Sequence, residues 1–292
     1  MYLRKLVKRM NDTLNLCEML PHFMRNWASL SDIMQGSKVD RVNRVYLGSY
    51  FCSQSFINTR EYIINLAKQC RQADICVTLA VPIFSEKNLR ESDEAIDSII
   101  HNSGSVIDEI VVNEYSQLSV LHEKYNISLG MGRLLFKNQR DIRYPDLLNA
   151  EYENAATDFV TELIEKYNIG TIEYDPIHKS MTLATIEGAL PAVHYPYCYI
   201  STGMVCEFAS INRPLVKKFR PNCSCACECG NVFTFKKLKG EDGMHTFCKI
   251  GRTEFYNAGD INIRGDVRMI YSPFDFYVKE AEEHVYGNSS TL

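Results

Sequence analysis

The chain has 292 residues, of which 46% are hydrophobic and 23% are charged, and this balance is that of an ordinary globular protein. Its formal net charge of −4 and its pI of about 6.0 exclude the strongly basic composition typical of nucleic-acid-binding domains. No stretch reaches the roughly 20 apolar residues of a membrane span, and no apolar signal segment follows the basic residues 1–10. We therefore expect a cytoplasmic protein without a membrane span.

Strand and helix patterns alternate along the chain after residues 1–40, which have a helical, amphipathic pattern without a clear strand. The sequence predicts strands at 44–49, 74–83, 108–114, 127–132, 170–175 and 190–200. It predicts helices at 59–72, 85–101, 116–125 and 157–167. This order is typical of parallel βαβ units, and no glycine-rich phosphate loop follows the first strand. We expect an α/β fold of the (β/α) TIM-barrel-like kind, including an incomplete or distorted form of that barrel.

The character of the sequence changes after Gly230. Residues 232–237, 246–250 and 266–271 alternate between apolar and polar side chains and are bounded by glycine and aspartate, which predicts antiparallel strands. We expect a barrel-like domain at residues 1–230 that carries the cysteine site. A β-rich C-terminal appendage at residues 231–292 is expected to pack on it.

Four cysteines occupy every second position of one short run: Cys223, Cys225, Cys227 and Cys229. A structural cysteine usually behaves as a single small hydrophobe, whereas alternate side chains of an extended segment share one face. The run therefore predicts thiols that face a metal, a metal cluster or disulfide partners. The total of eleven cysteines is odd and is spread over a long chain, which does not suit a secreted disulfide scaffold. We favour a metal or a metal cluster.

Functional side chains of (β/α) barrels lie at the carboxyl ends of the strands. Applied to the predicted strands, this rule places Cys52 and Cys206 on one rim, although they are far apart in the sequence. It also selects Glu114, Arg133 and Asp175 as candidate catalytic residues, because carboxylates and a cation beside a metal cluster would suit a substrate site. An internal layer of salt bridges is the alternative explanation for these three residues.

Two segments resemble a known family. Val45–Ser53, with the sequence Val-Tyr-Leu-Gly-Ser-Tyr-Phe-Cys-Ser, is similar to the Val-Tyr-Leu-Gly-x-x-x-Cys-x segment of the collagenase-like peptidases, family U-32. Ala189–Cys206 is similar to the Gly-x-Leu-Pro-strand-Cys element of that family, and in both a loop with Arg-Pro then leads to close-set cysteines. Within the family, the chain most resembles the UbiV-type iron–sulfur proteins of oxygen-independent ubiquinone hydroxylation.

The resemblance implies a 4Fe–4S cluster at the barrel mouth, held by Cys52, Cys206 and two cysteines of the run. The closing pair of the family is separated by three residues, so Cys223 with Cys227 or Cys225 with Cys229 fits, and we prefer the first pair. The resemblance also implies an oxygen-independent hydroxylation or a related redox modification of an organic small molecule. A partner protein of the same family, in a heterodimer, is implied as well.

Two other functions stay open. Cys248 and His245 would complete a structural zinc site with two cysteines of the run, in a non-catalytic scaffold or binding protein. The third alternative is a metal-dependent peptidase. However, the sequence contains no Ser/His/Asp order, no His-Glu-x-x-His motif and no P-loop.

Overall fold

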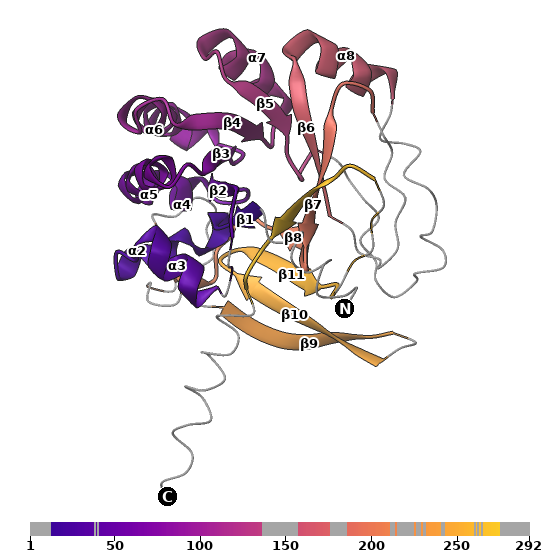
Figure 1. Cartoon of the computed structure of the whole chain (residues 1–292). Coiled ribbons are helices and arrows are strands. Elements are labelled where there is room, and N and C mark those ends of the chain that lie inside the picture. Colours follow the sequence, from indigo (N-terminus) through magenta and orange to yellow (C-terminus); the bar gives the residue numbers. More distant parts are fainter. Residues whose placement is uncertain are drawn as a thin grey trace, which may run out of the picture.

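Eight parallel strands close into a barrel in the computed structural model of the chain, in the order β1-β12-β7-β6-β5-β4-β3-β2 (Figure 1). This confirms the predicted α/β, TIM-barrel-like fold. The structure describes residues 13–37, 39, 41–135, 157–175, 186–210, 214, 225, 229, 232–240, 243–259, 261, 263 and 265–274. The barrel strands are β1 (Thr13–Asn15), β2 (Arg44–Gly48), β3 (Cys76–Val81), β4 (Ile107–Val112), β5 (Ser128–Met131), β6 (Ile169–Tyr174), β7 (Leu190–Tyr195) and β12 (Arg268–Tyr271).

Helices cover the outside of the barrel between consecutive strands from β1 to β6 (Figure 1). The longer ones are amphipathic, so that one side buries apolar residues against the strands while the other side faces water. In the helix Arg60–Gln72, for example, Tyr62, Ile63, Leu66, Ala67 and Cys70 are buried. The helices are α2 (Leu20–Arg25), α3 (Leu30–Gly36), α4 (Ser53–Asn58), α5 (Arg60–Gln72), α6 (Leu89–Asn102), α7 (Tyr115–Lys124) and α8 (Asp158–Tyr167), with short 3₁₀ turns η1 (Cys17–Met19), η2 (Glu86–Asn88) and η5 (Phe208–Ser210).

Hydroxyl side chains cap the starts of α3 and α8. Ser29 forms a capping box at α3, because its hydroxyl accepts from the backbone N–H of Asp32 while its own N–H donates to the Asp32 carboxylate at 2.9 Å. Thr157 accepts from the N–H of Val160 at the start of α8, where the sequence predicted a helix to begin.

A four-stranded antiparallel sheet packs against the carboxyl end of the barrel. It consists of β8 (Tyr197–Thr202), β11 (Thr253–Asn257), β10 (Gly243–Ile250) and β9 (Val232–Gly240), in that order. Aromatic rings join the two units: the ring of Phe51, which follows β2, lies 5.1 Å from that of Tyr199 and 5.7 Å from that of Phe255. The predicted antiparallel strands at 232–237 and 246–250 are thus confirmed.

Three local predictions were wrong. Residues 266–271 do not belong to the antiparallel sheet, because β12 runs parallel to both β1 and β7 and closes the barrel. Residues 1–40 contain a strand, β1, which is only three residues long. The single strand predicted at 190–200 is two strands in different sheets, separated by the cis Tyr195–Pro196 peptide. The barrel therefore takes strands from both sides of residue 230.

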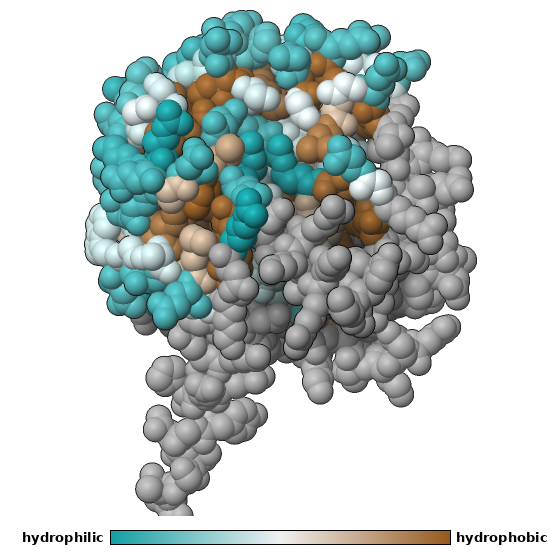
Figure 2. All heavy atoms as spheres, viewed as in Figure 1, coloured by the Kyte–Doolittle hydropathy of each residue, from teal (hydrophilic) through white to brown (hydrophobic). Residues whose placement is uncertain are grey.

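Hydrophilic side chains lie along the outer edge of the face in Figure 2, and hydrophobic ones show inside this edge. In the described residues, every helix is too short or too polar to cross a membrane.

Candidate functional site

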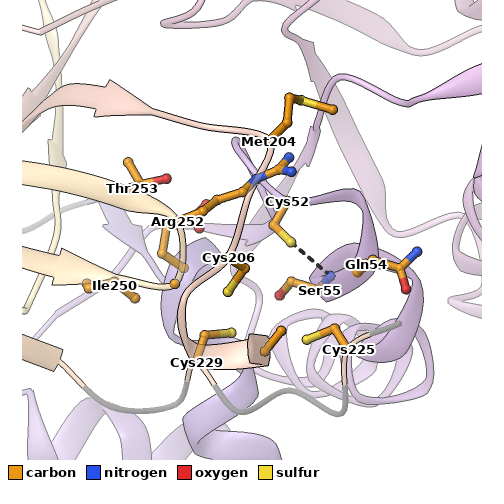
Figure 3. A pocket seen from close by; sticks show the side chains of 13 residues that line it. Cys52, Gln54, Ser55, Met204, Cys206, Cys225, Cys229, Ile250, Arg252 and Thr253 are labelled. Carbon is orange, nitrogen blue, oxygen red and sulfur yellow. Dashed lines mark hydrogen bonds between the residues drawn. The ribbon is translucent and has the colours of Figure 1, made fainter. Parts of the chain in front are cut away.

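A pocket beside the carboxyl end of β2 brings four cysteines together (Figure 3). It contains about 570 Å³ of space, part of which is open to solvent. The sulfur atoms of Cys52, Cys206, Cys225 and Cys229 point into the same region of this pocket in the close-up. Its lining residues are Glu18, Cys52, Gln54, Ser55, Met204, Cys206, Ala209, Cys225, Cys229, Ile250, Gly251, Arg252 and Thr253.

Cys52 is positioned by the turn between β2 and α4. Gly48 ends β2 with a φ of +112°, and a Cβ there would lie 2.2 Å from the carbonyl oxygen of Ala80, so only glycine allows the turn to approach β3 so closely. The Ser49 hydroxyl then accepts a hydrogen bond from the N–H of Cys52 at 3.1 Å. The N–H of Ser55 donates to the Cys52 sulfur at 3.5 Å. The turn therefore presents this thiol toward the pocket.

The other cysteines come from two different segments. Cys206 lies between β8 and η5, and its carbonyl oxygen accepts from the Ser210 hydroxyl at 2.9 Å. The side-chain amide of Asn58, at the end of α4, donates to the carbonyl oxygen of Cys225 at 2.7 Å. That hydrogen bond ties the cysteine run to the helix that follows Cys52.

The structure brings Cys52 and Cys206 to one pocket and adds Cys225 and Cys229 from the run. Cys225 and Cys229 are the second of the two pairs that fit the three-residue spacing. Both members of the preferred pair, Cys223 and Cys227, lie outside the described residues. The described residues do not form the zinc site considered as an alternative. Cys248 is buried in β10 and does not line the pocket, and the side chain of His245 lies outside the described part of the structure.

The donor set determines which cofactor these residues could hold. Four cysteine thiolates are the usual ligands of a 4Fe–4S cluster, and soft sulfur ligands favour iron–sulfur clusters, zinc or copper(I) over hard cations. Within the described part of the chain, no three His, Cys, Asp or Glu side chains form a group that could hold a single metal ion. A 4Fe–4S cluster binds each of its four thiolates through a different iron, so the four thiols that line this pocket match the number and type of its ligands.

Among the described residues that line the pocket, one side chain is cationic and one is acidic. Arg252 supplies the cation, and its guanidinium partly offsets the effect of burial, which raises the pKa of the Cys52 thiol to about 11. Glu18 supplies the carboxyl group, which accepts from the N–H of Tyr50 at 2.9 Å, and burial raises its pKa above the ordinary value. Arg252 thus places a cation beside Cys52, which suits an anionic occupant, while Glu18 lines the same pocket.

Arg133 and Asp175 lie together, but Glu114 does not join them. Arg133 and Asp175 form a completely buried ion pair at the ends of β5 and β6, in which the guanidinium Nε lies 2.9 Å from a carboxylate oxygen. Glu114 lies at the start of α7 and accepts from the hydroxyl of Ser116 at 2.8 Å. None of these three residues lines the cysteine pocket.

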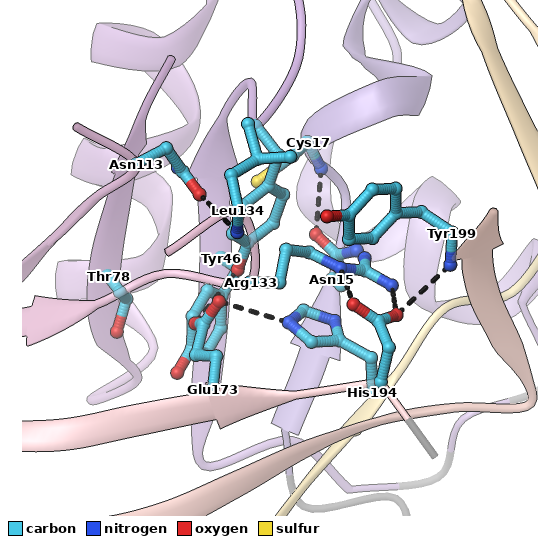
Figure 4. Close-up of polar contacts among 12 residues, drawn as sticks. Asn15, Cys17, Tyr46, Thr78, Asn113, Arg133, Leu134, Glu173, His194 and Tyr199 are labelled. Carbon is cyan, nitrogen blue, oxygen red and sulfur yellow. Dashed lines mark hydrogen bonds and ion pairs between the residues drawn. The ribbon is translucent and has the colours of Figure 1, made fainter. Parts of the chain in front are cut away.

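A second polar cluster, which was not predicted from the sequence, lies inside the barrel (Figure 4). The Tyr50 hydroxyl donates to one carboxyl oxygen of Glu173 at 3.0 Å, and the His194 Nε2 lies 3.1 Å from the other. Burial raises the pKa of Glu173 to about 8, and burial together with the charge of Arg133 lowers the pKa of His194 well below its ordinary value. At neutral pH this cluster is therefore made mainly of neutral, hydrogen-bonded groups.

A signal for this cluster was present in the sequence. Thr171, Glu173 and Asp175 take alternate positions in a segment that is otherwise apolar, so their side chains share one face of β6. All three are buried, and this face points into the barrel, where Glu173 meets Tyr50, which follows β2, and His194 of β7.

Comparison with known proteins adds no relative: no protein-family model, no curated protein and no solved structure matches this chain.

Proposed function

We propose that the chain is a cytoplasmic iron–sulfur protein in which Cys52, Cys206, Cys225 and Cys229 hold a 4Fe–4S cluster at the rim of the barrel. The single observation that carries this proposal is that four cysteines from three segments line one pocket. Structural packing alone does not account for such a convergence, since a buried cysteine is usually a lone hydrophobe.

The surroundings of the thiols support the same proposal. A 4Fe–4S cluster with four thiolates carries net negative charge, and Arg252 places a cation in the pocket. Met204, Ala209 and Ile250 add apolar surface that limits the access of water. When bound, a cluster of this kind supplies one-electron transfer, with a reduction potential that depends on nearby charge, hydrogen bonds and solvent exposure.

By its resemblance to the UbiV-type branch of the collagenase-like peptidases, the chain would take part in an oxygen-independent hydroxylation or a related redox modification. Its substrate would be an organic small molecule, and a partner of the same family would complete the enzyme. The complete burial of Arg133 and Asp175 favours the internal salt bridge over a catalytic role for this pair. Glu114 is the only predicted catalytic residue of the three that is partly exposed.

The test is anaerobic purification, followed by an ultraviolet–visible spectrum and by measurement of iron, acid-labile sulfide and zinc. We expect a brown protein with a broad absorption band that bleaches on reduction, and with nearly equal amounts of iron and sulfide. The Cys206→Ala variant should lose the band. Full cluster content in that variant would overturn the assignment, and a colourless protein that contains only zinc would favour the scaffold alternative.

Cys76→Ala is the matched control for Cys206→Ala. Cys76 is exposed at the start of β3, which is the opposite end of the barrel from the pocket. Its replacement should leave the iron content unchanged. Equal loss of iron in both variants would indicate a general effect of removing a thiol.

A further inference from the structure

The turn between β10 and β11 contacts all three segments that carry the pocket cysteines. Ile250 pairs with Thr253, so Gly251 and Arg252 form a two-residue hairpin turn. Both turn residues line the pocket, and the guanidinium of Arg252 lies beside Cys52 in the close-up (Figure 3). This turn belongs to the four-stranded sheet, and it reaches back to the barrel.

The first contact is to the segment of Cys52. The Nε of Arg252 donates to the carbonyl oxygen of Phe51 at 2.7 Å, and its Nη2 donates to the same oxygen. Phe51 immediately precedes Cys52. A two-point hydrogen bond from a planar guanidinium fixes the position of that carbonyl group more closely than a single donor would.

The second contact is to the segment of Cys206. The backbone carbonyl oxygen of Arg252 accepts from the N–H of Gly203 at 3.3 Å, three residues before Cys206. Beside it, the Nζ of Lys249 on β10 lies 2.8 Å from the carboxylate of Glu207, which immediately follows Cys206. The strand and turn therefore hold this loop from both sides of the cysteine.

The third contact is to Cys229. Gly251 has a φ of +57°, and a Cβ built on it would lie 3.3 Å from the Cβ of Cys229 and 3.9 Å from its sulfur. A larger residue would push against this cysteine and would be strained in the left-handed region. Glycine therefore lets the turn approach Cys229 directly.

We infer that Gly251 and Arg252 are the positioning residues of the cysteine pocket, setting the places of Cys52, Cys206 and Cys229 relative to one another. The role of the turn in arranging the thiols stands on these contacts. Its effect on a cluster rests on the proposed function. Because Arg252 also carries the charge next to Cys52, it raises the reduction potential of whatever anionic cluster the thiols hold.

The test uses the full chain in two states. In the reduced, metal-free protein, a bifunctional thiol reagent such as dibromobimane links thiols that lie close together, and mass spectrometry identifies each linked pair. In the anaerobically reconstituted protein, iron content and the midpoint potential are measured. The variants are Arg252→Gln, which removes the charge, and Arg252→Lys, which keeps the charge but not the two-point contact. Arg44→Gln, a partly buried arginine at the opposite end of the barrel, is the control.

We expect Arg252→Gln to lower the yield of links between Cys52 and the other pocket cysteines at least threefold, and to shift the midpoint potential to a more negative value. Arg252→Lys should restore the potential more fully than the link yield. Arg44→Gln should change neither. Unchanged links and an unchanged potential in Arg252→Gln would overturn the inference.

Gly251→Ala decides the question if Arg252→Gln does not fold. In this variant, links that involve Cys229 should fall while links between Cys52 and Cys206 persist, and wild-type yields for Cys229 would overturn the inference. The two proposals can fail separately. A wild-type chain that binds no iron contradicts the proposed function, whereas the link yields still test the positioning role.

Discussion

Arg133 and Asp175 form a completely buried ion pair that joins the barrel to the four-stranded sheet. The carboxylate of Asp175 also accepts from the N–H of Tyr199 on β8 at 3.0 Å. The guanidinium carbon of Arg133 lies 5.4 Å from the centre of the Tyr199 ring and 6.0 Å from that of Phe255 on β11. The pair therefore stabilises the packing of the sheet against the carboxyl end of the barrel.

Removing one member of this pair should destabilise the fold strongly. Asp175→Asn leaves the Arg133 cation buried without its counter-charge, and we expect the free energy of unfolding to fall by about 3–5 kcal/mol. Urea denaturation measures this loss. The double variant Arg133→Met/Asp175→Leu should lose less than Asp175→Asn, because it buries no charge. A loss below about 1 kcal/mol in Asp175→Asn would contradict the role assigned to the pair.

The Glu173→Gln variant should change how stability depends on pH. Burial raises the pKa of Glu173 from 4.5 to about 8. Between these two values the unfolded chain loses the proton while the folded protein keeps it, so this group lowers the free energy of unfolding as pH rises. At roughly 1.4 kcal/mol for each pH unit, the effect amounts to a few kcal/mol.

Glutamine keeps hydrogen-bonding groups for Tyr50 and His194 but does not ionise. Wild type should therefore lose stability relative to Glu173→Gln as pH rises from about 4.5 to about 8. Urea denaturation at a series of pH values measures the difference. Parallel stability curves for the two proteins would show that Glu173 ionises normally in the fold.

Asn15 should contribute to closing the barrel. Its side-chain amide donates to the hydroxyl of Ser272 at 3.0 Å, next to β12, and its oxygen accepts from the N–H of Cys17 at 3.1 Å. Asn15→Ala leaves buried polar groups unpaired, so we expect a loss of about 1–3 kcal/mol in the free energy of unfolding. In a double-mutant cycle with Ser272→Ala, additive losses would show that the two side chains do not interact.

Single replacements within the cysteine run should distinguish the two candidate pairs. Cys225→Ala and Cys229→Ala should each lose most of the iron, because both residues line the pocket. Cys223→Ala and Cys227→Ala make the same substitution in the same run, so they serve as controls, and both should keep the iron. Iron and sulfide per chain, measured after anaerobic reconstitution, give the answer. Loss of iron in Cys223→Ala and Cys227→Ala, with iron kept in the other two variants, would instead favour Cys223 and Cys227 as the ligands.

The sequence predicts the barrel well where strands are long and apolar, as in β3 and β4, whose sides are both covered. It fails where tertiary pairing decides the structure. Three residues of β1 give no periodic signal, and β12 alternates like an antiparallel strand although it lies between two parallel neighbours. Only the closure of the barrel shows that both are barrel strands.

The candidate site was also predicted in part. The strand-end rule and the family resemblance select Cys52 and Cys206, which line the same pocket. Arg252 was missed because its importance comes from a hydrogen bond to Phe51, a residue 201 positions away, and nothing local to Arg252 indicates it. Glu18 was missed for a similar reason, since it reaches the pocket from the turn after the unrecognised β1.

The insertion of the four-stranded sheet between β7 and β12 has a consequence for synthesis on the ribosome. Seven barrel strands leave the exit tunnel before residues 268–271 do, while the sheet segment is still being translated. Until then β1 and β7 are open edges with unpaired backbone groups, which are prone to join other chains. The barrel thus stays open during this period, and its two edge strands can pair with other chains.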